Sequence, residues 1–172
     1  MRAKGAYRYR LDRRWSGGAG LCGFIMLNPS TADARSDDPT IRRCIGFAKG
    51  WGYSGLIVGN IFALRATDPT MLLAACDPVG GAANARALVD LIEEATLILC
   101  AWGRFVGVGQ RGKEAITLIR ARGRLPHCLG LTKSGAPRHP LYVPGSTQPI
   151  SLDQSSESRA AFFRPELPDL CT

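Results

Sequence analysis

Three polar side chains, Asn28, Asn60 and His139, directly follow or lie near the ends of short apolar runs in this 172-residue sequence. An asparagine amide can accept a hydrogen bond from a water and orient it, and its donor and acceptor atoms match the edge of a nucleobase or of another amide. A histidine can donate a hydrogen bond to a developing oxyanion, or it can transfer a proton. If they met, the three side chains could place a water, recognise an amide-like edge and stabilise negative charge.

Each of these residues also has an ordinary structural explanation. The run Asn28-Pro29-Ser30 is typical of a turn, although Pro29 pushes Asn28 into an extended conformation and so aims its carboxamide in one direction. Asn60 could cap a helix or turn, and His139 could be a packed or surface histidine. The pair Trp102-Gly103 indicates packing more than reaction, with the glycine allowing close backbone approach. Only the placement of these residues separates the two explanations.

The surrounding pattern predicts alternating strands and helices. Bulky and charged residues alternate over 7–15, which is typical of a half-exposed edge strand, whereas the later strands are almost wholly apolar, as in strands buried on both faces. The predicted buried strands are 21–27, 56–59, 97–101 and 127–131. The predicted helices are a first one capped by Thr40 and running to about residue 48, then 84–95 and 113–121.

This alternation predicts a three-layer α/β/α sandwich with a central, mostly parallel four-stranded sheet and an N-terminal edge strand. Ligands of such sheets bind beyond the carboxyl ends of the strands. Asn28, Asn60, the Trp102-Gly103 pair and the loop around His139 all follow predicted strands. We therefore expect them to line one cleft.

The chain is expected to form one domain over residues 1–144. A short extended piece is predicted at 141–143. From 145 to 172 the composition changes to Ser, Gln, Pro and Glu, which predicts a poorly ordered tail.

The formal net charge of +8 favours nucleic acid or another phosphate-bearing partner, although the excess could serve solubility alone. No apolar run is long enough to span a bilayer and no secretory signal is visible, so we expect a cytoplasmic monomer that does not bind membranes. The six cysteines form no C-x-x-C pair and are not spaced with the two histidines as metal ligands. No metal, cofactor or disulfide is expected.

Long motifs identify a family. The segments 27–33, 38–43, 60–69, 101–103 and 137–142 resemble an uncharacterised bacterial and phage domain-of-unknown-function family, numbered 1643, over residues 7–143. That resemblance implies no activity.

The same order of motifs distantly resembles the uracil-DNA glycosylase superfamily. This second resemblance implies hydrolysis of an N-glycosidic bond, with Asn28 positioning water, Asn60 reading the base and His139 stabilising the departing base. Two motifs depart from the superfamily pattern: Leu27 replaces a glycine in the first, and Leu141-Tyr142 replaces a Ser-Pro pair in the last.

We therefore expect a glycosylase-like hydrolase acting on a damaged or modified base in DNA. One alternative is an enzyme that acts on a free nucleotide, nucleoside or modified base. The other is a non-catalytic module that binds nucleic acid or a nucleotide. The expected substrate-binding residues, besides Asn60, are Pro29, Ser30, Phe62, Trp102 and Gly103. The expected nucleic-acid contacts are Arg42, Arg65, Arg104 and Arg138 at the rim, with Leu141 or Tyr142 filling the gap left by a flipped base.

Overall fold

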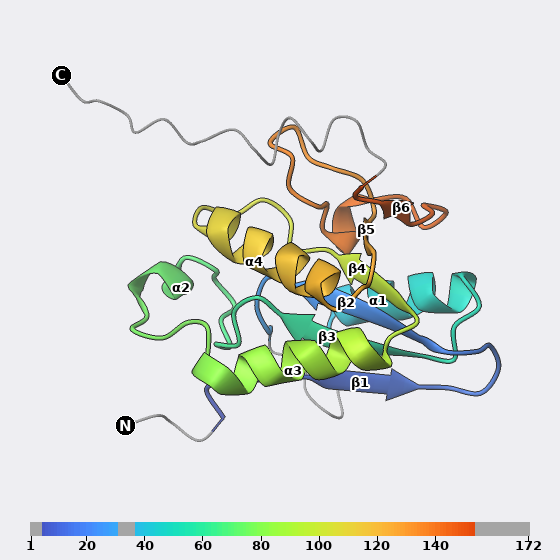
Figure 1. Ribbon diagram of the computed structural model, residues 1–172, viewed down its shortest axis with the longest axis horizontal. Coiled ribbons are helices and arrows are strands. Elements are labelled where there is room, and N and C mark those ends of the chain that lie inside the picture. The colour runs from blue at the N-terminus through green and yellow to red at the C-terminus, as the bar shows by residue number, and fades with distance from the viewer. Residues whose placement is uncertain (1–4, 31–36, 154–172) are drawn as a thin grey trace.

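The computed structural model describes residues 5–30 and 37–153 (Figure 1). Its elements in chain order are β1 (Leu11–Arg14), β2 (Leu21–Met26), α1 (Pro39–Gly50), β3 (Gly55–Asn60), α2 (Met71–Ala74), α3 (Gly81–Glu94), β4 (Leu97–Cys100), α4 (Val108–Ala121), β5 (Pro126–Cys128), the 3-10 helix η1 (Pro140–Tyr142) and β6 (Ile150–Ser151).

The strands form one mixed sheet in the order β1-β3-β2-β4-β5-β6. The neighbours β3, β2, β4 and β5 run parallel, whereas β1 and β6 pair antiparallel at the two edges. The predicted α/β class is confirmed. The predicted sheet is too small because β6 is only two residues long and its apolar–polar alternation, over residues 150–153, is too short to stand out in a mostly polar segment.

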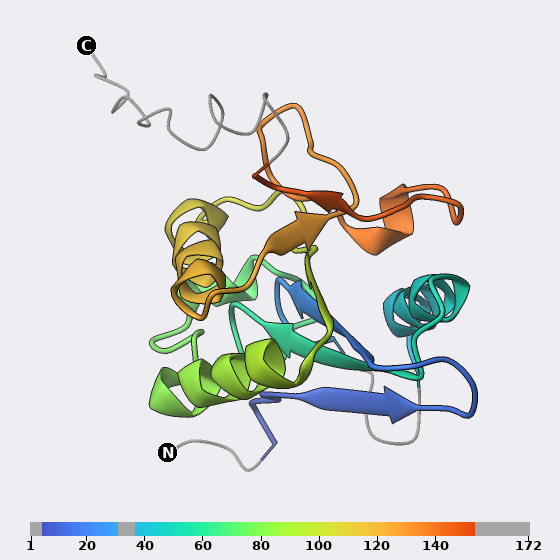
Figure 2. The same cartoon turned by 45° about the vertical axis from the view of Figure 1, so that its right-hand side comes forward.

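Helices cover both faces of the sheet (Figure 2). On one face, α1 packs through Ile41, Cys44 and Phe47. On the other, α3 and α4 pack through apolar stripes that include Leu91 and Ile119. All six residues of β2 are buried, as expected for a central strand covered on both sides.

The helix starts differ from those predicted, because backbone geometry and not side-chain capping begins two of them. Left-handed Gly80 and Gly107 precede α3 and α4, which therefore start several residues earlier than expected and have no side-chain cap. The cap of α1 is Asp38, with a proline following it, and not Thr40.

The predicted extended piece at 141–143 is largely the 3-10 helix η1, which follows from Pro140 at its first position. The sheet also continues past residue 144, where a tail was predicted: β6 pairs with β5, and Leu152 is buried in the core. The rest of the predicted tail, 154–172, lies outside the described residues. In the part of the chain that the structure describes, none of the helices has the length and apolar character needed to cross a membrane.

The connections open a crevice at the carboxyl ends of the strands. The chain leaving β2 leads to α1 on one face, whereas the chain leaving its neighbour β4 leads to α4 on the other. Connections that diverge in this way leave a hollow between them, which is where α/β sheets bind ligands.

Candidate active site

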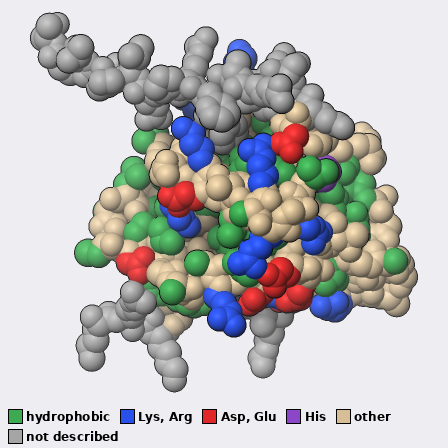
Figure 3. All heavy atoms as spheres, in the orientation of Figure 1, with side chains coloured by type: hydrophobic (Ala, Val, Ile, Leu, Met, Phe, Trp, Pro, Cys, Tyr) green, Lys and Arg blue, Asp and Glu red, His purple; other side chains and the backbone are tan. Residues whose placement is uncertain are grey.

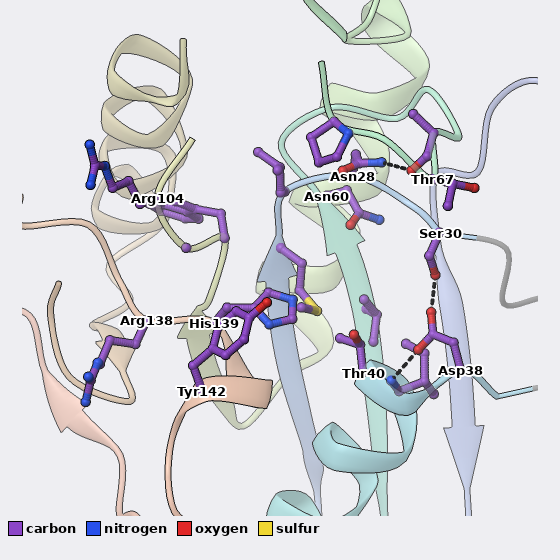
Figure 4. Close-up of a pocket in the computed structure, with 18 of the residues that line it drawn as sticks. Asn28, Ser30, Asp38, Thr40, Asn60, Thr67, Arg104, Arg138, His139 and Tyr142 are labelled. Atoms are coloured by element: carbon purple, nitrogen blue, oxygen red, sulfur yellow. Dashed lines mark hydrogen bonds between the residues drawn. The ribbon is translucent and has the colours of Figure 1, made fainter. Parts of the chain in front are cut away.

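A cavity of about 470 Å³ occupies this crevice, a size usual for small-molecule sites. Figure 4 shows Asn28 and Asn60 along one side of it, His139 and Tyr142 on a second, and Ser30, Asp38 and Thr40 on a third. The structure thus brings together most of the residues singled out in the sequence. Those that line the cavity are Asn28, Ser30, Asn60, Trp102, Gly103, Arg104, Arg138, His139 and Tyr142.

Asn60 ends β3 with a buried carboxamide, 2% exposed, at the cavity wall. Its Nδ2 has no hydrogen-bond partner among residues 5–30 and 37–153. Its backbone is held, because its carbonyl accepts from Asn84 Nδ2 of α3 at 3.0 Å. The next carbonyl, that of Ile61, accepts from the Arg111 guanidinium of α4 at 3.2 Å. Leaving a buried N–H unpaired costs about 1–3 kcal/mol, so this amide favours a ligand that offers an acceptor.

Asn28 is half-buried, and backbone carbonyls fix the direction of its amide. Its Nδ2 donates to the carbonyl of Ala66 at 2.7 Å and to that of Pro29 at 3.1 Å. With the N–H groups occupied in this way, Oδ1 is the atom left to accept from a water. The two carbonyls also select an amide over a carboxylate, because a carboxylate has no N–H to donate to them.

His139 presents a neutral imidazole to the cavity. Burial lowers its pKa below the usual value, an effect that the negative charge of Asp38 partly opposes. Nδ1 accepts from the backbone N–H of Leu141 at 3.4 Å. The proton of the neutral ring therefore lies on Nε2, which makes that atom a hydrogen-bond donor. The ring also contacts Tyr142, with 5.6 Å between ring centroids.

The Trp102-Gly103 pair allows His139 to approach β4. Gly103 has a φ of 74° and its backbone N–H donates to the carbonyl of Pro137 at 2.9 Å. A Cβ at Gly103 would lie 3.2 Å from Cβ of His139, so a larger residue would press against the histidine. From the other side, the Arg43 guanidinium of α1 donates to the carbonyl of Val143 and ties the η1 segment to that helix.

Asp38 is a site residue that sequence reasoning missed. It lines the cavity as the one acidic side chain among the described residues that do so. Its Oδ1 accepts from the backbone N–H of Ile41 at 2.7 Å, and its Oδ2 accepts from Ser30 Oγ. The sequence signal was the pair Asp38-Pro39 before an amphipathic helix, which also fits an ordinary helix cap. Arg8, buried and lining the same cavity, was missed as well.

Other predicted site residues lie elsewhere. Phe62 does not line the cavity: the chain bends after β3 ends at Asn60, and the ring packs into the core on the α3 and α4 face. Pro29 is buried and does not line the cavity, and neither does Leu141, which is 42% exposed. Arg42 and Arg65 are exposed on segments next to lining residues but do not line the cavity themselves.

Arg104 and Arg138 are exposed where they line the cavity. In Figure 4 their side chains point away from His139, toward the outside of the site. On the face shown in Figure 3, Lys and Arg side chains are interspersed with acidic ones and do not merge into one patch. The two arginines therefore suit contacts made outside the cavity, such as contacts to phosphate groups.

Comparison with known proteins identifies a family that the chain matches. A family model described as a protein of unknown function, DUF1643, matches residues 8–141, which confirms the family expected from the motifs. No curated protein and no solved structure matches the chain.

Proposed function

The chain belongs to the DUF1643 family of proteins of unknown function, and from the geometry of its cleft we propose that it hydrolyses the N-glycosidic bond of a damaged or modified base in DNA. One observation carries this proposal: a buried carboxamide with an unpaired N–H, that of Asn60, lines the same cavity as the neutral imidazole of His139. This pairing suits a flat, hydrogen-bonding group that leaves with negative charge.

Four of the lining residues then have a role in the proposed reaction. A base turned out of the duplex enters the cavity and offers an acceptor to Asn60 Nδ2. Asn28 Oδ1 holds a water, and His139 Nε2–H stabilises the departing base. Tyr142, 76% exposed beside His139, fills the space that the base leaves in the duplex.

The distant resemblance to uracil-DNA glycosylases supports the same activity. In this chain, as in the mismatch-specific branch of that superfamily, an Asn-Pro pair, a base-reading asparagine, a Trp-Gly pair and a His-Pro pair follow one another along the chain. The parallel neighbours β3, β2, β4 and β5, with helices on both faces, are compatible with such a fold.

A panel of labelled oligonucleotides tests the proposal. Each oligonucleotide carries one damaged or modified base, in single-stranded and duplex form, and is scored for abasic sites by alkaline cleavage. We expect abasic sites with at least one base. Release of base only from free nucleosides or nucleotides would instead establish the small-molecule alternative, and binding without release would establish a non-catalytic binder.

Binding to duplex DNA is expected to weaken steeply with added salt. Every phosphate contact contributes about −0.9 to the slope of log affinity against log salt concentration, because bound counterions are released. Arg104 and Arg138 together should therefore supply about −2 of the slope, and changing both to glutamine should remove that part for every sequence tested. Fluorescence anisotropy across a salt series measures the slope.

Arg86→Gln is the control for this experiment, because Arg86 is exposed on α3, the helix that packs on the sheet face away from Asp38 and α1. The control should leave the slope close to that of the wild type. Binding that does not respond to salt, or an equal loss of slope with Arg86→Gln, would contradict an arginine contact at the cavity mouth.

A further inference from the structure

Negative charge beside the sugar speeds cleavage of an N-glycosidic bond, because positive charge builds up on the ring as the bond to the base lengthens. Asn28 cannot supply that charge. Its amide is neutral, and the carbonyls of Ala66 and Pro29 hold its N–H groups in place. A carboxylate on another part of the cavity wall is the group that can supply it.

We infer that Asp38 is that carboxylate and is a catalytic residue of the proposed hydrolysis; this inference rests on the proposed function. Asp38 lines the cavity together with Asn28, Asn60 and His139, on the side opposite His139 in Figure 4. The unpaired amide of Asn60 independently indicates that a ligand occupies this space. For this role, a base held between Asn60 and His139 must have its sugar on the α1 side of the cavity.

The contacts of Asp38 hold its carboxylate still and leave it able to react. One hydrogen bond reaches each oxygen, from the backbone N–H of Ile41 and from Ser30 Oγ. A carboxylate has about four acceptor positions, so lone pairs remain for a water. Both Asp38 and His139 line the cavity, and the negative charge of Asp38 opposes the lowering of the His139 pKa by burial.

The step balances without any further reactant. The bond between the sugar carbon and the base nitrogen breaks, and its electron pair leaves with the base, which His139 Nε2–H stabilises. The oxygen of the water on Asn28 bonds to the sugar carbon, and Asp38 accepts the proton that this water loses. The base anion then takes a proton from solvent, and Asp38 returns its proton to solvent.

The structural role of Asp38, as the cap of α1, can be kept while its charge is removed. As the cap of α1 it needs only an acceptor oxygen, which asparagine and serine supply about as well as aspartate. Asp38→Asn and Asp38→Ser should therefore both fold with little change in melting temperature while losing the charge. Because asparagine and serine differ in shape, an effect common to both variants comes from the lost charge and not from local repacking around one new side chain.

The test compares binding of two duplex oligonucleotides that differ at one sugar. One carries a pyrrolidine in place of a deoxyribose, which puts a positive charge where the sugar becomes cationic, and the other carries a neutral tetrahydrofuran. The wild type should bind the pyrrolidine duplex tighter by about tenfold or more. In both Asp38 variants the ratio of the two affinities should fall to near one. The ratio cancels the general gain in DNA affinity that follows from removing an acid.

Asp37→Asn is the matched control, because Asp37 is the adjacent acid but pairs with Arg13, at 2.7 Å, and does not line the cavity. This variant should keep the wild-type ratio. An unchanged ratio in the Asp38 variants, or no pyrrolidine preference in the wild type, would overturn the assignment of Asp38 but not the proposed function. Wild-type binding of both duplexes no tighter than unmodified DNA would overturn the proposed function and this inference with it.

Discussion

Replacing His139 with alanine is expected to slow release of the base about 10²–10³-fold, the usual effect of removing one donor to a developing anion. The neutral ring holds its proton on Nε2 because Nδ1 accepts from Leu141, so the substitution removes that donor. Binding of DNA should change far less than turnover, since the phosphate contacts remain. Single-turnover rates on the most reactive oligonucleotide of the panel measure the effect.

His127→Ala is the control for this substitution. His127 is the only other histidine of the chain; it lies on β5, its Nδ1 contacts the carbonyl of Leu125, and it does not line the cavity. Its loss should leave the rate unchanged. If the His139 variant loses activity only in proportion to a lower melting temperature, or if both histidine variants lose it equally, His139 is structural and not catalytic.

The sheet could be predicted largely from apolar runs, because strands buried on both faces leave a strong signal. Every residue of β2 and of β3 is buried, and both strands end within a residue or two of the predicted position. Elements that depend on long-range pairing or on glycine geometry left a weaker signal. β6 exists because it pairs with β5, and α3 and α4 begin after Gly80 and Gly107 without a side-chain cap.

The cavity could be predicted in part from the positions of polar residues after the predicted strands. Residues that follow parallel strands share one end of the sheet, so Asn28, Asn60 and His139 could be grouped without knowing any contact. The direction of a side chain after a strand ends could not be predicted. The sequence therefore did not show that Phe62 turns into the core and not toward the cavity. Asp38 caps α1 and also lines the cavity. The sequence does not distinguish the two positions, because an Asp-Pro pair before a helix is typical of an ordinary cap.

Asn28 shows how local hydrogen bonding limits the choice of catalytic group. Its amide donates to two backbone carbonyls that belong to the loop after β2 and to the segment after β3, so it fixes the cavity wall as well as facing the cavity. A carboxylate here would set its oxygens against these carbonyl oxygens. The fold therefore selects an amide at this position and leaves the negative charge to Asp38.

Replacing Asn28 with alanine should reduce turnover by about 10²-fold or more, because the attacking water loses the acceptor that orients it. Binding of an abasic product duplex should change little, which separates positioning of the water from recognition of DNA. The same substitution removes the hydrogen bonds to Ala66 and Pro29, so the melting temperature should fall as well. Rates are therefore compared at a temperature where both proteins are fully folded.

Asn28→Asp keeps the shape of the side chain and changes only its chemistry. Without an N–H to donate, the carboxylate faces the carbonyls of Ala66 and Pro29, and we expect it to destabilise the fold more than alanine does and not to restore turnover. Thermal melts and single-turnover rates of the two variants measure this. A folded Asn28→Asp protein that matched or exceeded the wild-type rate would show that position 28 accepts the catalytic carboxylate, and it would remove the need for Asp38.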